Sequence, residues 1–296
     1  MSNPNRINRV VDENEAAANV ENGMTVAIGE PYPMALVRKL IQRQVKDLTV
    51  ICSGVALDML IAAGCVKKVI SYYAGGGTGI PVAPSFRHAA ETGESDIWEC
   101  EEGILCAGLE ASAKNLPYLP WRGGVGTSIP ELNPDLKLIE DPFKGESLIA
   151  VPAIRPHVTL LHAAQADCFG NVQHQGGPGW LDLFLHRAAE KTIVQVEKIV
   201  SNEQIRATPW FTTIDNADHL VPLAYGAHPF YSRGYYLQDI AFIDDYLSAA
   251  SNASKGDRDS LERFFETYIN DCRNHTDYLD RLGHQRLSDL AEYPDG

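Results

Sequence analysis

Several features that would place this chain outside the ordinary globular enzymes are missing from its sequence. Among its 296 residues, no apolar run reaches the length needed to cross a membrane. The N-terminal stretch MSNPNRINRVVDENEAAANV lacks the apolar core of a signal peptide, so we expect a cytoplasmic protein. The six cysteines form no CxxC pair and are widely scattered, which favours reduced, packed side chains over disulfides or zinc ligands.

Positive charge is also scarce. The chain carries 39 acidic residues against 25 lysines and arginines, a formal net charge of -14. Proteins that bind nucleic acid need a basic face, so this balance argues against such a partner. A single pocket can still be basic on an acidic protein, which makes Arg87, Arg122 and Arg155 noticeable.

Recognisable catalytic signatures are few as well. The histidines show no metal-ligand spacing such as HExxH, so we expect no metal site. No GxSxG string is present, and a Ser-His-Asp triad is therefore not supported. The bulk composition, 45% hydrophobic and 22% charged, suits one large α/β domain or two modest ones.

What the sequence does contain is an alternation of short apolar strands with helices. Repeated strand–helix units of this kind predict an open, mostly parallel α/β sheet flanked by helices. We expect this fold over residues 1–236, with residues 237–296 as a helical C-terminal extension of the same domain. The predicted strands are 24–28, 48–52, 66–73, 148–151, 158–163, 193–196 and 220–223, and the predicted helices are 33–44, 56–63, 84–91, 104–115, 181–191, 237–251, 257–272 and 275–282.

The most informative stretch runs from Trp98 to Pro130. It holds an acidic cluster (Glu99, Glu101, Glu102), the helical run 104–115, a Leu-Pro-Tyr-Leu-Pro turn, and then Arg122 before Gly123 and Gly124. An acid, a cation and flexible backbone donors are the parts of a site for a carbonyl or carboxylate substrate. Trp98, Cys100, Ile104, Leu105 and Cys106 surround the acids, and apolar surroundings raise the pKa of a carboxyl group and suit it to proton transfer. A solvated charge run and a surface arginine remain open as the alternatives.

A second candidate region is the glycine loop Gly75–Gly79, which follows a predicted strand. Open α/β sheets bind ligands at such places, and the N–H groups of Gly75 and Gly76 would approach an anionic or carbonyl group. The loop has neither P-loop nor GxGxxG spacing, so a simple flexible turn is equally compatible with it. Ser53 is a further candidate for substrate binding. Tyr32, Met34, Tyr72, Tyr73, Trp121 and Trp180 are candidates for the wall of an apolar pocket.

Taken together, these strings resemble the A (alpha) subunit of family I CoA-transferases, above all the glutaconate CoA-transferase type. The resemblance covers nearly the whole chain. It rests on GMTVAIG, VKDLTVI, LPYLPWRGGVGTSI, DPFKGESLIAVPAIRPHVTLLHAAQADCFGNV, AAEKTIVQVEKIVSNEQIR, LVPLAYGAHPF and DYLDRLGHQRL.

The resemblance implies an open α/β sheet between helices and, as partner, a homologous B (beta) subunit in an α2β2 assembly. It implies a coenzyme A thioester as substrate and no permanently bound cofactor. In the glutaconate type the nucleophilic glutamate lies on the B subunit, so this chain alone would be inactive.

Two departures from that family pattern matter. The glycine- and arginine-containing loop after the first strand is shortened here to Gly29-Glu30-Pro31-Tyr32-Pro33, which puts an acyl-carboxylate contact from that loop in doubt. The position of Glu102 is typically not acidic in the glutaconate transferase. It is acidic in the steroid ring-cleaving hydrolase branch, and Glu102 and Arg122 match that branch's glutamate and arginine.

Three reactions follow from the resemblance. The first is hydrolytic carbon–carbon cleavage of a cyclic β-keto acyl-CoA, a retro-Claisen ring opening with Glu102 as base and Arg122 stabilising the oxyanion. The second is CoA transfer between carboxylic acids with the nucleophile on the partner, and a glutaconyl-CoA-type decarboxylase is a third variant. A regulatory binding role would need a DNA-binding segment, and none is present.

Overall fold

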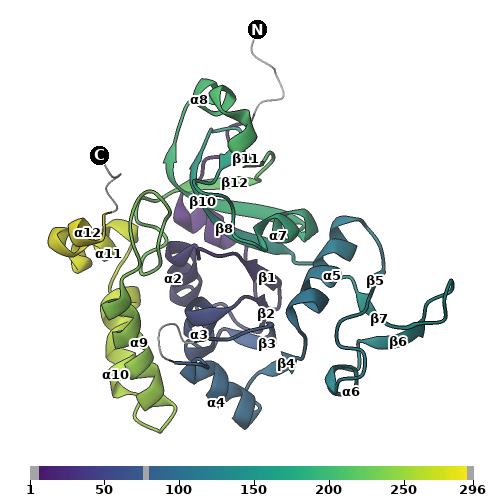
Figure 1. Cartoon of the computed structure of the whole chain (residues 1–296). Helices are drawn as coiled ribbons and strands as arrows, with labels where there is room; N and C mark the ends of the chain where they lie inside the picture. Colours follow the sequence, from purple (N-terminus) through teal and green to yellow (C-terminus); the bar gives the residue numbers. More distant parts are fainter. Residues whose placement is uncertain (1–6, 76–79, 292–296) are drawn as a thin grey trace.

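The computed structural model describes residues 7–75 and 80–291. Within them the main sheet has nine strands, and seven run parallel in the order β12-β10-β8-β1-β2-β3-β4 (Figure 1). These are β1 (Thr25–Ile28), β2 (Leu48–Ile51), β3 (Val66–Ile70), β4 (Asp96–Trp98), β8 (Val158–Ala166), β10 (Lys191–Ile199) and β12 (His219–Pro222). β9 (Val172–Gln173) runs antiparallel to the far end of β8, and β11 (Thr212–Ile214) runs antiparallel to β9. The prediction of an open, mostly parallel sheet is therefore confirmed.

Helices cover both faces of this sheet, and each face has its own core. One core joins α1 (Glu13–Ala18), α2 (Met34–Gln42) and α3 (Gly54–Ala62) with α9 (Ile240–Ala253) and α10 (Asp259–Phe265). The other core lies under α5 (Glu102–Ala113) and α7 (Asp182–Ala188). Because β2 is covered on both sides, it appears in the sequence as a largely apolar run, whereas β3 carries Lys67 and Lys68 at its less buried positions. The remaining helices are α4 (Pro84–Thr92), α6 (Ile129–Leu132), α8 (Asn202–Ala207), α11 (His275–Leu282) and α12 (His284–Leu290).

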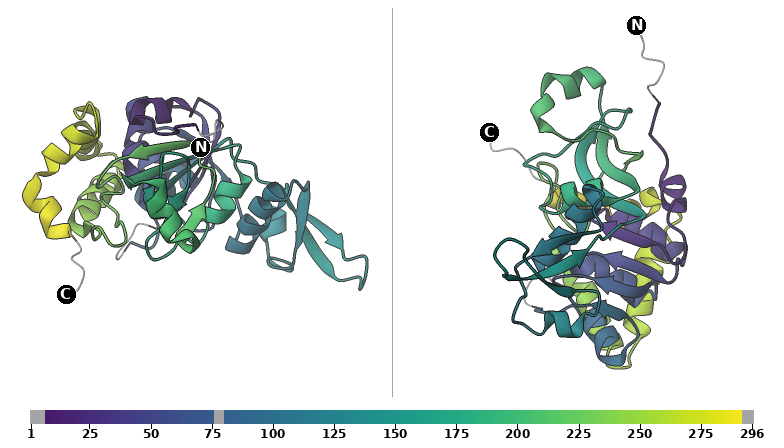
Figure 2. Two further views of the ribbon diagram at one scale, coloured as in Figure 1. Left: turned by 90° about the horizontal axis from the view of Figure 1, so that it is seen from above. Right: turned by 90° about the vertical axis from the view of Figure 1, so that its right-hand side faces the viewer.

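A smaller antiparallel sheet extends away from the body of the molecule (Figure 2). Its strands are β5 (Tyr118–Trp121), β7 (Ser147–Pro152) and β6 (Lys137–Glu140), with β7 in the middle. Two predictions are wrong here. The Leu-Pro-Tyr-Leu-Pro segment is mostly strand rather than turn, because β5 is an edge strand and an edge strand tolerates Pro120. Residues 148–151, counted with the parallel strands, belong to β7.

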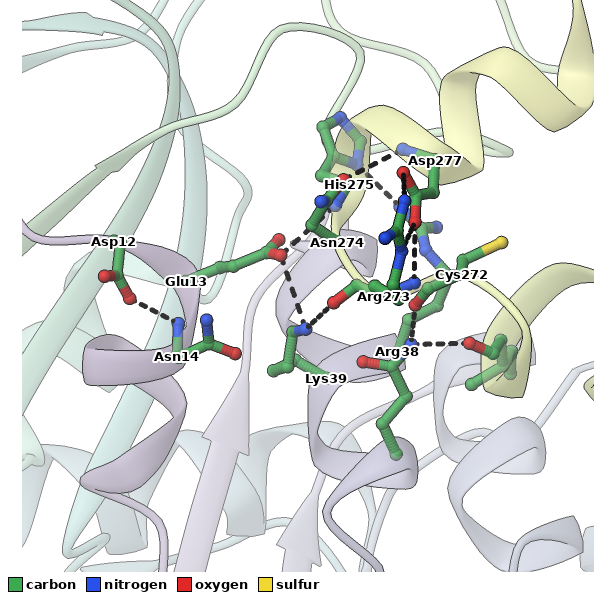
Figure 3. A network of polar contacts seen from close by, with 12 residues as sticks. Asp12, Glu13, Asn14, Arg38, Lys39, Cys272, Arg273, Asn274, His275 and Asp277 are labelled. Atoms are coloured by element: carbon green, nitrogen blue, oxygen red, sulfur yellow. Dashed lines mark hydrogen bonds and ion pairs between the residues drawn. The ribbon is translucent and has the colours of Figure 1, made fainter.

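Buried polar contacts connect the C-terminal segment to the first helices of the chain, α1 and α2 (Figure 3). The Glu13 carboxylate accepts a hydrogen bond from the backbone N–H of His275 at 3.1 Å and lies 3.3 Å from Lys39 Nζ. Lys39 also donates to the carbonyl oxygen of Arg273 at 3.1 Å. Both Glu13 and Lys39 are buried; their charges neutralise one another, and the backbone of the C-terminal segment provides further hydrogen bonds to both.

The C-terminal segment departs from its prediction in detail. The predicted helix 257–272 is α10 followed by a short π-helix (Glu266–Asn270), and α12 was not predicted. No helix within residues 7–75 and 80–291 is long and apolar enough to cross a membrane.

Candidate active site

The candidate site lies where the parallel strands of the main sheet end. The chain leaves β1 at Glu30, β2 at Ser53 and β3 at Tyr72, and it leaves β4 shortly before Glu102. Because these strands are parallel, their carboxyl ends meet at one edge of the sheet. The strand order also reverses at β1, which has β2 on one side and β8 on the other. Open α/β sheets bind ligands at such a switch point.

A small hollow with a free volume of about 20 Å³ opens at this edge. Its polar lining comes from Glu30, Ser53, Tyr72 and Trp180, and its apolar lining includes Leu105 and Leu185. Tyr72 and Trp180 thus lie in the wall where an apolar pocket was predicted. Of the other predicted wall residues, Met34 is fully buried in the core, and Tyr73 is exposed.

Hydroxyl groups converge on Ser53. Ser53 Oγ lies 3.1 Å from the Tyr32 hydroxyl and is also hydrogen-bonded to Tyr72. The rings of Tyr72 and Trp180 meet edge to face, with centroids 5.3 Å apart. Burial raises the pKa of Tyr72, so its hydroxyl stays protonated at neutral pH and can donate a hydrogen bond.

Glu30 supplies the carboxylate of the hollow. Burial raises the pKa of Glu30, and the positive charge of Arg233 opposes that shift. Its negative charge contributes, after burial, to the raised pKa values of both Cys52 and Tyr72, which locates the carboxylate beside these side chains. The sequence placed Glu30 in a shortened loop and did not single it out. Glu30 follows the apolar strand β1 in the same way that Ser53 follows β2, and this position could have indicated that Glu30 belongs to the site.

Behind the hollow lies a buried pair that the sequence did not predict. Asp182 Oδ2 accepts the N–H of Gly179 at 2.9 Å and lies 3.6 Å from His174 Nε2. Burial raises the pKa of Asp182 to about 7 and lowers the pKa of His174 to about 4. His174 Nε2 and Asp182 Oδ1 have no hydrogen-bond partner among the described residues. Both side chains are therefore neutral over part of the pH range around 5 to 6.

The acidic cluster divides into two roles at the start of α5. Glu101 caps the helix: its carboxylate accepts the N–H groups of Gly103 and Ile104, each at 2.7 Å, and Trp121 Nε1 at 2.8 Å. Glu102 is the first residue of the helix, and its side chain is exposed. The expectation that apolar neighbours enclose Glu102 is therefore wrong for this chain by itself, because those neighbours point into the core.

Glu102 nevertheless faces the site. Its charge contributes, after burial, to the raised pKa values of Tyr72 and Cys106. Glu30 acts on Tyr72 as well, so the charges of two carboxylates contribute to its raised pKa. The structure brings Glu102, Tyr72 and Ser53 to one edge, as the parallel strands require.

Arg122 and its glycines lie beside the start of α5. The Trp121 indole packs so closely on Gly103 that a side chain there would overlap it, and a Cβ on Gly123 would approach the Glu101 carboxylate to 3.0 Å. The Arg122 side chain is 71% exposed and forms an ion pair with Glu146, the residue directly before β7. A substrate oxygen would have to compete with Glu146 for this guanidinium.

The glycine loop after β3 falls partly among the described residues. Gly75 is buried against the ring of Tyr73, which leaves no room for a side chain. Gly76 lies outside the described residues, so its candidate role stays a prediction. No group of three or more His, Cys, Asp or Glu side chains that could hold a metal ion occurs within 7–75 and 80–291.

Comparison with known proteins agrees with this fold and this edge. The family model for coenzyme A transferase matches residues 11–216. The cholesterol ring-cleaving hydrolase IpdA subunit of Mycobacterium tuberculosis is 34% identical over 273 residues, which cover 86% of this chain and 91% of that protein. The glutaconate CoA-transferase A chain of Acidaminococcus fermentans is 31% identical over 299 residues, covering 93% and 92% of the two chains.

Solved structures give the same result. The crystal structure of glutaconate coenzyme A-transferase from Acidaminococcus fermentans superimposes with a TM-score of 0.89 at 30% identity, covering 97% of this chain and 96% of that one. A crystal structure of the decarboxylase AibA/AibB superimposes with a TM-score of 0.75 at 28% identity, covering 87% and 98%. The chain belongs to the coenzyme A transferase family. Within that family it is part of an enzyme, like its transferase and hydrolase relatives.

Proposed function

We propose that this chain is the A subunit of a two-subunit enzyme that acts on an acyl-CoA thioester. The reaction we favour is hydrolytic carbon–carbon cleavage of a cyclic β-keto acyl-CoA. Glu102 carries this proposal, because it brings a carboxylate to the edge of the sheet on this chain itself. The similarity to a cholesterol ring-cleaving hydrolase subunit over 86% of the chain supports it.

In this reaction a water molecule adds to the ring ketone and the bond to the α-carbon breaks. The electron pair passes into an enolate of the thioester. Glu102 serves as the general base, acting on water or on the substrate. Arg122 and the N–H groups of Gly123 and Gly124 stabilise the oxyanion as it forms, which is the largest contribution in many enzymes. The proposal requires the substrate to draw Arg122 away from Glu146.

The partner is a homologous B subunit, which we propose forms an α2β2 enzyme with this chain. The coenzyme A thioester enters as the substrate, and no permanently bound cofactor is needed for the proposed steps. We also propose that residues 237–296 extend the domain formed by residues 1–236. The contacts of Glu13 with His275 and Lys39, and the core shared by α2 and α9, support this assignment.

The test is the variant Glu102→Gln, purified in complex with the B subunit. We expect ring opening of a cyclic β-keto acyl-CoA to slow by about 10² to 10⁴-fold, as for loss of a general base, while binding of the ester stays close to that of the wild type. Glu99→Gln is the matched control, since Glu99 is exposed in the same acidic cluster. Full turnover by Glu102→Gln would exclude Glu102 as the base.

CoA transfer between carboxylic acids is the second candidate, and the close superposition on glutaconate CoA-transferase favours it. This reaction would follow ping-pong kinetics and leave a glutamyl–CoA thioester on the B subunit that hydroxylamine cleaves. Detection of that adduct by mass spectrometry, together with unchanged activity of Glu102→Gln, would establish transfer instead of hydrolysis. A decarboxylase, as in AibA/AibB, would release carbon dioxide and form no such adduct.

A further inference from the structure

The hollow at the end of β1 has the size of a site for water. Its free volume of about 20 Å³ is close to the roughly 10–15 Å³ that one buried water molecule needs. An acyl group does not fit into this space. The hollow therefore marks a position next to the substrate and not the substrate's own pocket.

The polar groups around the hollow suit a water molecule, which needs two to four hydrogen-bond partners. Glu30 offers carboxylate oxygens, and Ser53 and Tyr72 offer hydroxyl groups that already bond to one another. The remaining wall is largely apolar, with Ile28, Leu105 and Leu185, so water has no alternative partners on that side.

Glu30 is chemically prepared for such a role. Neither a hydrogen bond nor an ion pair within the described part of the chain occupies its carboxylate. Burial raises the pKa of Glu30, which strengthens its carboxylate as a base, and the positive charge of Arg233 opposes that shift. Asp182 lies behind the hollow. Burial raises its pKa to about 7, so below about pH 7 its carboxyl group is largely protonated and does not carry a full negative charge beside Glu30.

We propose that Glu30 holds and deprotonates the hydrolytic water, so that two carboxylates on this chain divide the proton transfers. This inference rests on the proposed ring-opening function. Glu30 takes a proton from water while the water oxygen bonds to the ring ketone carbon. The bond from that carbon to the α-carbon then breaks, and its electron pair forms the thioester enolate. With Glu30 as the base for water, Glu102 acts on the substrate alone: its protonated form delivers a proton to the α-carbon and its carboxylate form removes one in the exchange reaction. Solvent carries the proton from Glu30 back to Glu102. The balance is one water consumed, one new carboxylic acid and one new C–H bond.

The experiment compares Glu30→Gln with Glu102→Gln in the complex with the B subunit. The probe is 2-oxocyclohexane-1-carboxyl-CoA, the simplest six-membered cyclic β-keto thioester. Ring opening is measured by incorporation of ¹⁸O from water, and exchange at the α-carbon is measured separately in D₂O. We expect Glu30→Gln to slow ring opening by about 100-fold or more and to keep α-carbon exchange within about threefold of the wild type. Glu102→Gln should lose both, and Glu99→Gln should lose neither.

Three results would overturn this assignment. Ring opening by Glu30→Gln at close to the wild-type rate, with the wild type active, contradicts the role of Glu30 and leaves the proposed function intact. Equal loss of ring opening and exchange would show that Glu30 has only a structural role. If the wild-type complex transfers CoA and opens no ring, the proposed function fails and this inference fails with it. Independently of any substrate, a crystal structure should show ordered water within about 3 Å of the Glu30 carboxylate, and a dry hollow would contradict the proposal.

Discussion

Replacing Glu101 by alanine should destabilise the protein, whereas replacing the neighbouring Glu102 should mainly affect catalysis. Glu101 accepts hydrogen bonds from two backbone N–H groups at the start of α5 and from the Trp121 indole. Loss of a helix N-cap side chain costs typically about 1 kcal/mol and up to about 2 kcal/mol. The Trp121 hydrogen bond adds about 0.5–1 kcal/mol after allowance for an indole that is 38% exposed.

The sum predicts a loss of about 1.5–3 kcal/mol for Glu101→Ala, or a fall in Tm of about 2–5 °C for a chain of 296 residues. The assay is thermal unfolding followed by circular dichroism, with tryptophan fluorescence reporting on Trp121. The matched control is Glu102→Ala. It removes the adjacent, exposed carboxylate and should cost only the helix-dipole contribution of about 0.3–1 kcal/mol.

The two variants should therefore separate stability from activity. Glu101→Ala should unfold earlier, whereas Glu102→Ala should keep its stability and lose turnover. An unchanged Tm in Glu101→Ala, or a larger loss in Glu102→Ala than in Glu101→Ala, would refute the division of roles within the acidic cluster.

Three further outcomes follow from the structure. Lys39→Met leaves the buried carboxylate of Glu13 uncompensated and should cost about 3–5 kcal/mol in denaturant unfolding, most of it regained when Glu13→Gln is added. Gly103→Ala would push against the Trp121 ring and should cost about 1–3 kcal/mol, with a shifted fluorescence maximum that reports the displaced ring. Burial raises the pKa of Asp182 in the folded state to about 7, so the free energy of unfolding falls as the pH rises from about 4 to 7. Asp182→Asn should remove this decline. Within this window the variant should gain about 1.4 kcal/mol of unfolding free energy relative to the wild type for each pH unit. Urea unfolding at several pH values measures this gain, and a constant difference between the two proteins would contradict it.

The fold was largely predictable because its central strands are buried on both faces. Leu48–Ile51 is a largely apolar run of strand length, Val66–Ile70 has valine or isoleucine at three of its five positions, and helical patterns follow both along the chain. The short strand β4 and the strand β6 of the smaller sheet carry no such run, since they are partly exposed. β4 and β6 are strands because they pair with β3 and β7, and not because of the residues they contain.

The site was predictable only in part. Glu102, Tyr72 and Trp180 were candidates from the sequence, because strand ends and apolar neighbours mark them, and the structure brings them to one region. The sequence could not distinguish the roles of Glu101 and Glu102. The two side chains are chemically identical, and only the direction in which the backbone points each of them separates the helix cap from the exposed carboxylate. Glutamate is also not among the usual N-cap residues, so no capping rule selects Glu101. Asp182 lies behind the hollow, next to His174, and no sequence motif predicts this buried pair.

The close superposition on glutaconate CoA-transferase does not decide which reaction this chain performs. That transferase and the ring-cleaving hydrolase are both relatives, and the same sheet therefore serves transfer and hydrolysis. The difference must lie in the side chains that leave the strand ends, where the fold fixes position but leaves residue type free. A transferase that keeps its nucleophile on the partner needs no carboxylate of its own at this edge. This chain has two, Glu30 and Glu102, and the charges of both contribute to the raised pKa of Tyr72. Glu30 lines the hollow of the size of one water molecule and Glu102 is exposed at the start of α5, and this placement of two acids favours hydrolysis as the proposed reaction.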